Sequence, residues 1–259
     1  YRSSAPFTDS GKDFGSGVII ILADPAMANE LSNSYALDLF ALKEMPEDAV
    51  HMYQQRIAVY GDEGVRHGLK TLGFEYDSVG TGDLNSGVIS GYDVFINYGL
   101  RWSSLNIGGQ ASFQNWFAAG GDYVALSNRG RAIDFANDAG WVEVDYGYIS
   151  GNAIVKVDYD PADSIASGFQ KDGYAFVYRS VWFTDWDDLA VSARIDSGDF
   201  LVSGFWEDWQ SSGANGMPII VHKSDEDSDV VLIGIDNTFR GHPEDTFRIL
   251  GNAIYDGFD

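Results

Sequence analysis

Cysteine is absent from the 259-residue sequence, and lysine and arginine are scarce. The missing cysteine excludes disulfides, thiolate zinc sites and cysteine nucleophiles together, although it does not identify the compartment. The 16 basic residues stand against 39 acidic ones, which gives a formal net charge of -23. Such a surface repels phosphate backbones and anionic lipid. We therefore expect neither nucleic acid nor the cytoplasmic membrane surface as a partner.

Long apolar runs are also missing. No uninterrupted apolar stretch approaches the length of about 20 residues that crosses a bilayer, so we expect a soluble chain without a membrane span. Hydrophobic residues nevertheless make up 45% of the sequence and aromatic residues 14%, which is typical of a folded globular protein. No repeat of fixed period and no low-complexity tract is present.

Short apolar runs alternate with helical patterns in the first half of the chain. The strands predicted there are 57–60, 74–79, 93–98 and 122–126. The helices predicted there are 65–72, 113–117 and 132–139. Strands that are apolar throughout and separated by helices indicate a parallel sheet covered on both faces.

The second half is dominated by strands. The strands predicted there are 153–158, 175–183, 200–206, 218–222 and 230–235, and they are followed by one amphipathic helix at 244–255. We therefore predict a three-layer α/β sandwich of flavodoxin-like order, with a mostly parallel sheet and later strands that are partly antiparallel. Residues 56–259 form this domain. Residues 1–55, with a strand at 18–22 and a helical segment at 35–40, are predicted to be an extension or linker packed on it.

Ligands bind at the carboxyl ends of the strands in an open parallel sheet. Four segments follow such strand ends, at 61–64, 99–102, 127–130 and 236–240. The candidate pocket residues that they supply are Asp62, Glu63, Arg101, Trp102, Ser127, Asn128, Arg129, Gly130 and Arg240.

The segment at 127–130 has the pattern of a nucleophile elbow, a sharp turn between a strand and a helix. Asn128 stands where the nucleophile would be, and an amide can only form hydrogen bonds. Asn also tolerates the left-handed backbone that such a turn requires. Ser127 lies one position from the turn apex, which makes a serine hydrolase the weaker alternative. The elbow is therefore predicted to have lost its chemistry.

The order of strands, turns and helices resembles the class I glutamine amidotransferase-like fold. The C-terminal segments 230–240 and 245–253 are similar to the end of the amidotransferase-like domain fused behind certain bacterial zinc carboxypeptidases. The elbow helix, with Ala132, Phe135, Ala136, Asn137 and Gly140, is also similar, and 13–18 resembles the link that follows the peptidase domain there.

This resemblance implies a non-catalytic accessory or binding domain of an exported zinc carboxypeptidase-type protein, in the extracellular space or periplasm. Its partner would be its own upstream peptidase domain, or a peptide or glycan substrate. Two departures separate the chain from working members. An amidotransferase of this fold carries cysteine at the position of Asn128, and the zinc motif His-x-x-Glu is missing. Neither parent active site can be transferred to this chain.

Tryptophans beside carboxylates give an alternative, a carbohydrate-binding or glycosidase-associated domain. Trp206, Glu207 and Trp209 follow an apolar strand, and indole faces flanked by acids suit sugar rings. The competing interpretation is that the seven tryptophans mostly pack in the core. A carboxylate pair for glycoside hydrolysis, such as Glu207 with Asp62, requires a known separation.

Two further candidates involve histidine and calcium. His242 stands beside Arg240 and before Pro243, where a helix-capping role competes with ligand binding. Asp225, Asp227 and Asp229 could hold calcium, but the segment lacks the glycine and terminal glutamate of an EF-hand loop. A solvated hairpin turn is favoured there. No cofactor is expected with certainty, and calcium is the one candidate.

Overall fold

The computed structural model describes residues 54–149, 151–186, 188–207, 209–225 and 228–255, together with four short strands near the N-terminus. These strands are β1 (Arg2–Ser3), β2 (Thr8–Asp9), β3 (Lys12–Asp13) and β4 (Ile19–Ile20). The chain divides into two compact units, 1–54 with 258–259, and 55–257. In the first unit β1 pairs with β4 and β2 with β3, both antiparallel. The predicted strand at 18–22 contains β4, and the helix predicted at 35–40 lies outside the described residues.

Five parallel strands form one half of the large sheet in the second unit. They are β5 (Ile57–Tyr60), β6 (Asp77–Ser78), β7 (Val94–Asn97), β8 (Asp122–Leu126) and β16 (Ser228–Ile233). Their spatial order is β6-β5-β7-β8-β16, and every neighbouring pair is parallel. Numbered along the chain, this is the order 2-1-3-4-5 of flavodoxin-like folds. The predicted α/β fold class, with its parallel sheet and later antiparallel strands, is confirmed.

Antiparallel strands continue the same sheet beyond β16. They are β15 (Pro218–Asp225), β13 (Ala190–Ile195), β10 (Gly151–Tyr159), β11 (Asp172–Tyr178) and β14 (Leu201–Trp206). A separate ribbon pairs β9 (Asp145–Tyr148) with β12 (Val181–Asp185). The single strand predicted at 175–183 was therefore wrong. It is β11 and β12, in different sheets, because the backbone between them turns left-handed at Arg179, where φ is 52°.

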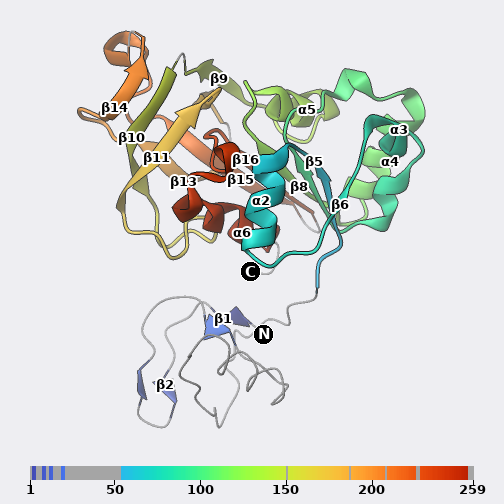
Figure 1. Cartoon of the computed structure of the whole chain (residues 1–259). Coiled ribbons are helices and arrows are strands. Elements are labelled where there is room, and N and C mark those ends of the chain that lie inside the picture. The colour runs from blue at the N-terminus through green and yellow to red at the C-terminus, as the bar shows by residue number, and fades with distance from the viewer. Residues whose placement is uncertain are drawn as a thin grey trace. The chain divides into compact units, whose positions relative to one another are not determined.

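Helices cover both faces of the parallel half. On one face lie α2 (Glu63–Thr71) and α6 (Phe247–Ile254), which contact each other (Figure 1). The helices of the other face are α3 (Thr81–Asn85), α4 (Ile107–Phe117) and α5 (Arg131–Ala139). Side chains alternate between the two cores: Val59 packs with α2, and Phe95 packs with Phe113 of α4. This alternation follows from the two-residue period of a strand and produces three layers.

The sequence explains how α2 is positioned. Val65 and Leu69, four residues apart, are both fully buried and anchor the helix on the sheet. The helix begins two residues earlier than the predicted 65–72 because Asp62 caps it. Short 3-10 segments complete the fold: η1 (Val88–Gly91), η2 (Trp102–Ser104), η3 (Trp209–Ser211), η4 (Phe239–Gly241) and η5 (Glu244–Thr246). Within the described ranges, no helix has the length and apolar character needed to cross a membrane.

Candidate functional site at the carboxyl edge of the parallel strands

The turn between β5 and α2 forms the first wall of the candidate site. Oδ1 of Asp62 accepts hydrogen bonds from the backbone N–H groups of Gly64 at 2.9 Å and Val65 at 3.2 Å. These N–H groups have no partner inside the helix, so the carboxylate satisfies them. Gly64 packs against the loop after β16, where a Cβ on it would lie 2.2 Å from the carbonyl oxygen of Thr238. The turn after β5 and the loop after β16 are therefore held in close contact.

The turn between β8 and α5 forms the second wall. Ser127 is fully buried, and its Oγ donates a hydrogen bond to the carbonyl oxygen of Arg179 at 3.0 Å. The backbone N–H of Arg129 donates to the same oxygen at 2.8 Å. The left-handed backbone predicted at Asn128 lies one residue later. Arg129 has φ 58° and Gly130 has φ 74°, where the chain turns to bring the Arg129 N–H onto that carbonyl.

Asn128 links the ends of β7 and β8. Its Nδ2 donates to the carbonyl oxygen of Tyr98 at 3.3 Å. Gly99 has φ 120°, and a Cβ there would lie 2.8 Å from Nδ2 of Asn128, so the close approach of the two turns requires glycine. At this corner the Asn128 amide thus bridges two strand ends, and the buried Ser127 hydroxyl is hydrogen-bonded to the backbone.

A cavity of about 410 Å³ opens between these walls. Its lining comes from the ends of β5, β6 and β7, from the corner after β8, from α2 and from the turn before β12. The lining residues are Val59, Tyr60, Gly61, Asp62, Arg66, Ser78, Val79, Tyr98, Asn128 and Arg179. In the order 2-1-3-4-5, the strand order reverses between β5 and β7. The cavity therefore lies at the topological switch point, where flavodoxin-like folds bind their ligands.

Asp236 is a buried carboxyl group beside this cavity. It is 2% exposed, and the hydroxyl of Tyr98 donates to its Oδ2 at 3.3 Å. Burial raises the pKa of Asp236 to about 7, and the charge of Asp62 acts in the same direction. The Tyr98 hydrogen bond and the cationic Arg179 oppose this shift. The pKa of Tyr98 is itself raised, chiefly by burial and then by Asp236. Near neutral pH, Asp236 can therefore hold or release a proton.

Three arginines around the cavity have left-handed backbones. The φ angles are 58° for Arg129, 52° for Arg179 and 50° for Arg240. Among the residues that the structure describes, these are the only non-glycine residues with positive φ. All three are exposed. Such backbones are uncommon outside glycine, asparagine and aspartate, and they cluster at functional sites.

Of the nine residues predicted from the strand ends, only Asp62 and Asn128 line the cavity; Ser127, Arg129, Gly130 and Arg240 do not, and neither do Glu63, Arg101 and Trp102. Glu63 is exposed, with Oε1 3.4 Å from Nη2 of Arg66. Arg101 is also exposed. Trp102 is half-buried and faces the core of the α4 side, where its ring lies 5.0 Å from that of Phe135. The segment after β7 therefore supplies Tyr98 to the cavity instead.

The three residues predicted for sugar binding, and the separate ligand-binding candidate His242, lie elsewhere. Trp206 is 4% exposed and packs against Phe200, with ring centroids 5.2 Å apart, so its ring has no open face. Trp209 is half-buried with its edge on the same phenylalanine. Glu207 and His242 are exposed. None of the four is among the residues that line the cavity.

The calcium prediction falls partly outside the described residues. Asp227 is not described, and for Asp225 only the backbone, at the end of β15, is described. Asp229 is buried at 5% exposure in β16, and its backbone N–H donates to Oδ1 of Asp122 at 3.0 Å. In the part of the chain that the structure describes, no group of three metal-ligating side chains gathers.

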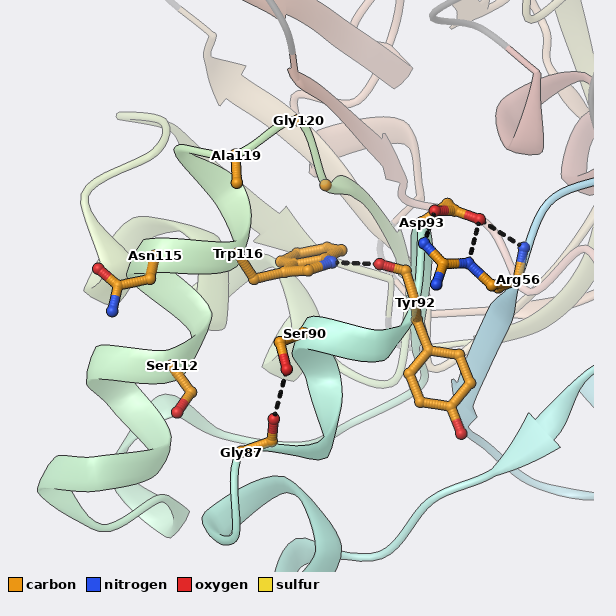
Figure 2. A pocket seen from close by; sticks show the side chains of 11 residues that line it. Arg56, Gly87, Ser90, Tyr92, Asp93, Ser112, Asn115, Trp116, Ala119 and Gly120 are labelled. Carbon is orange, nitrogen blue, oxygen red and sulfur yellow. Dashed lines mark hydrogen bonds and ion pairs between the residues drawn. The ribbon is translucent and has the colours of Figure 1, made fainter.

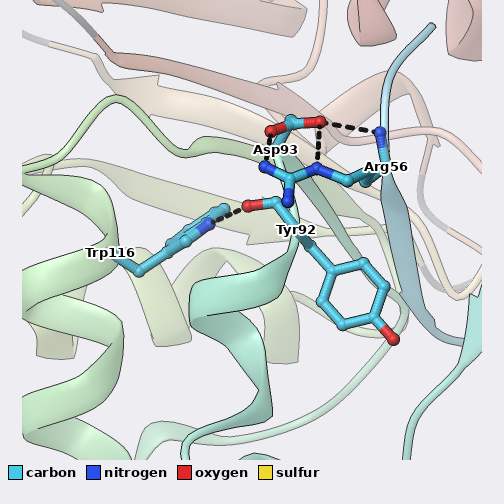
Figure 3. A network of polar contacts seen from close by, with 4 residues as sticks. All are labelled: Arg56, Tyr92, Asp93 and Trp116. Carbon is cyan, nitrogen blue, oxygen red and sulfur yellow. Dashed lines mark hydrogen bonds and ion pairs between the residues drawn. The ribbon is translucent and has the colours of Figure 1, made fainter.

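A second cavity, of about 290 Å³, lies at the amino ends of β5 and β7 (Figure 2). Two pairs of its polar groups bond to each other, Arg56 with Asp93 and Trp116 with Tyr92. The guanidinium of Arg56 donates to both carboxylate oxygens of Asp93, at 2.5 and 3.0 Å, and the Arg56 backbone N–H adds a third bond at 2.8 Å. The indole N–H of Trp116 donates to the carbonyl oxygen of Tyr92 (Figure 3). The Arg56 hydrogen bond lowers the pKa of Asp93.

Sequence reasoning missed the two arginines that line the cavity, Arg66 and Arg179, and its two tyrosines, Tyr60 and Tyr98. Arg179 reaches the site from the turn between β11 and β12, about fifty residues after β8, and no local pattern connects the two. Its one signal is a lone arginine inside an otherwise apolar run. Arg66 lies on α2, one turn after Asp62, and Tyr98 directly follows β7. Asp236 lies within the segment 236–240 but was not singled out.

Comparison with known proteins adds evidence on the fold alone. No family model matches the sequence, and no curated protein matches it. A cytoplasmic protein from Salmonella typhimurium is similar in structure, with a TM-score of 0.53, 12% identity, and coverage of 77% of this chain and 97% of that one. Alpha-L-fucosidase isoenzyme 2 from Paenibacillus thiaminolyticus matches with a TM-score of 0.50 and 13% identity, over 77% of this chain and 32% of its own.

A ThuA-like protein from Parabacteroides merdae is a further structural match. Its TM-score is 0.49 and its identity 10%, over 78% of this chain and 88% of that one. Together the fold and the cavity define a flavodoxin-like α/β domain with a polar site at its switch point.

Proposed function

We propose that this chain is a non-catalytic recognition domain that binds a small polar ligand in the cavity at the switch point. The observation that carries this proposal is the corner between β8 and α5. Hydrolases with a nucleophile elbow place their nucleophile at such a corner. Here Asn128 and Arg129 occupy the turn, and Ser127 is buried with its hydroxyl on the Arg179 carbonyl.

Binding is supported by what the cavity offers. Carboxylate, amide, phenol, hydroxyl and guanidinium groups converge there, from Asp62, Asn128, Tyr98, Ser78 and Arg179. A volume of about 410 Å³ is within the range of small-ligand sites. Several hydrogen-bonding groups around one concavity suit a ligand with many hydroxyl or charged groups better than an apolar one.

A glycan is the ligand class that we favour. The matched fucosidase uses the shared fold in about one third of its chain, so domains of this shape occur within a protein named as a glycosidase. In this chain, Tyr60 and Tyr98 line the cavity beside Asp62. Aromatic rings next to hydrogen-bond acceptors suit sugars. The accessory role beside an exported zinc carboxypeptidase stays a prediction from the C-terminal resemblance.

The proposal is tested by measuring turnover and binding on the same preparation. We expect no hydrolysis of p-nitrophenyl esters, peptides or p-nitrophenyl glycosides above the buffer rate, and no change in Ser127→Ala. Turnover that Ser127→Ala abolishes would contradict the non-catalytic part.

Binding is measured by calorimetry against neutral and acidic mono- and disaccharides. Asn128→Leu removes the amide from the cavity at nearly constant volume, and we expect it to weaken binding. Asn115→Leu alters an exposed amide on α4 and serves as the control. Equal affinity of the two variants would contradict the assignment of the site.

A further inference from the structure

We propose that the ligand is anionic and that the arginines around the switch-point cavity hold its carboxylate or phosphate oxygens. This inference rests on the proposed function and specifies the chemical class of the ligand. The relevant residues are Arg66 and Arg179, which line the cavity, and Arg129 and Arg240, which follow the ends of β8 and β16.

The distribution of charge is the first observation. The sequence has ten arginines within a net charge of -23. Six of them belong to segments that follow or contact the carboxyl ends of the parallel strands. They are Arg66, Arg101, Arg129, Arg131, Arg179 and Arg240. Most of the arginine of a strongly acidic protein is thus placed at one edge of its sheet. The same segments also carry the carboxyl groups of Asp62, Glu63 and Asp236, so an anion would be held by direct contact with guanidinium groups and not by a net positive field.

The second observation is that three of the four arginines named for the ligand form no ion pair among the described residues, whereas Arg66 lies 3.4 Å from Glu63 and also donates to the carbonyl oxygen of Gly61. Arg129, Arg179 and Arg240 form no ion pair with any carboxylate that the structure describes, whereas Arg56 at the opposite edge is bonded to Asp93. A guanidinium presents five N–H donors in a fixed fork that matches carboxylate and phosphate. Such donors are available for a ligand at the carboxyl edge.

Aromatic rings hold two of the guanidinium groups in place. Arg179 lies over the ring of Tyr178 at 5.2 Å, and Arg240 lies over the ring of Phe239 at 5.1 Å. The two rings are in contact, with centroids 4.8 Å apart. The four side chains form a continuous row of contacts from one arginine to the other, with the two rings tilted by 56°. Stacking on a ring face leaves the N–H edges of a guanidinium free to donate.

Backbone strain is the third observation. A left-handed backbone is unfavourable for a residue with a side chain, and glycine would avoid this strain. The chain nevertheless places arginine at each of the three non-glycine positions with positive φ in its described part. Arginine at these three positions must therefore provide an interaction through its guanidinium group that glycine cannot make. Binding an anion meets that requirement.

The carboxyl groups near the cavity do not cancel these charges. Asp62 accepts two backbone N–H groups at the start of α2, so its charge is stabilised by the helix. Asp236 is buried, 2% exposed, and accepts the Tyr98 hydroxyl. Arg179 is exposed and reaches the cavity lining. Asp62 is exposed and lines the same cavity as Arg179, but its Oδ1 is occupied by the two backbone N–H groups, whereas Asp236 lies buried beneath the lining.

The test uses calorimetry with three probes of the same ring size: glucuronate, glucose 6-phosphate and neutral glucose. We expect at least one anion to bind more tightly than glucose, with an affinity that falls as salt is raised. Arg179→Gly should weaken anion binding about tenfold or more, since a charge-assisted bidentate contact is lost. The midpoint of thermal unfolding should not fall, because glycine suits the left-handed backbone.

Lys70→Gln at the far end of α2 changes the net charge equally and should leave anion affinity unchanged. Arg240→Gly provides a second variant with the same expected loss of affinity. The inference of an anionic ligand would be overturned if glucose bound as tightly as the anions and Arg179→Gly left the affinity unchanged. If Asn128→Leu still weakened binding in that case, the proposed recognition function would be retained. Failure of both anions to bind would overturn the inference as well. Turnover dependent on Ser127 would instead contradict the proposed function.

Discussion

The two edges of the parallel sheet carry similar groups in different arrangements. At the amino edge, Arg56 and Asp93 bond to each other three times, and the Trp116 indole is bonded to the Tyr92 carbonyl. At the carboxyl edge, Arg179 has no ion pair among the described residues. Groups that satisfy one another stabilise the fold. Groups left with free hydrogen-bonding capacity around a cavity are available to a ligand, so the difference separates a structural edge from a recognition edge.

The largest effect that we predict concerns Asp236. Because its pKa is raised to about 7 from an ordinary value near 4, the folded state keeps a proton that the unfolded chain releases at lower pH. The contribution of Asp236 to stability therefore falls as pH rises from about 4 to about 7 and is constant above that. Asp236→Asn removes this dependence. Relative to the wild type, the variant should therefore be more stable at pH 8 than at pH 4 by about 4 kcal/mol in the free energy of unfolding.

Chemical denaturation at both pH values measures this difference. Asp138→Asn, at an exposed position of α5, is the matched control and should leave the pH profile unchanged. If the free energy of unfolding of Asp236→Asn and of the wild type depended on pH in the same way, the pKa of Asp236 would not be raised in the folded protein.

Gly64→Ala should produce the next largest effect. Its Cβ would lie 2.2 Å from the carbonyl oxygen of Thr238, so the turn after β5 and the loop after β16 must separate. We expect the free energy of unfolding to fall by about 2 kcal/mol. Gly82→Ala in α3 meets no atom within 4 Å and should raise it by about 0.5 kcal/mol, because alanine favours helix. Equal denaturation midpoints for the two variants would refute this contact.

Arg129→Gly should stabilise the protein slightly. It relieves a left-handed backbone, and the greater flexibility of the unfolded chain offsets part of the gain, so we expect an increase of about 0.5 kcal/mol. Arg131→Gly, in the first turn of α5, should lower stability by a similar amount because glycine disfavours helix. Urea midpoints measure both changes. A loss of stability in Arg129→Gly would mean that this arginine supports the fold and not a ligand.

Arg56→Gln should have the smallest effect. The ion pair with Asp93 is largely exposed, with 64% of the Arg56 side chain accessible, so water and salt screen it. We expect a small decrease in the thermal midpoint that diminishes at high salt, and no change in affinity for any ligand of the other edge. Lys171→Gln, an exposed cation without a described ion pair, is the control. A tenfold loss of ligand affinity in Arg56→Gln would reverse the assignment of the two edges.

The sequence predicts the sheet better than the site. Apolar runs such as 93–98 and 122–126 predict parallel strands because both faces of the sheet are buried. The strand ends then identify Asp62 and Asn128 by position alone. Arg179 could not be identified in this way, because its approach to Ser127 depends on how β11 and β12 separate into different sheets. Trp206 illustrates the opposite case, since its flanking acids suggested a sugar site but its ring fills the core.

The most direct test of the central claim is an amide NMR titration of the whole chain with glucuronate and glucose 6-phosphate. If the carboxyl edge recognises a ligand, the signals of Tyr98, Asn128 and Arg179 shift saturably, and the indole signal of Trp116 at the amino edge stays fixed. Saturable shifts at Trp116 and Arg56 with none at Asn128 would contradict the claim.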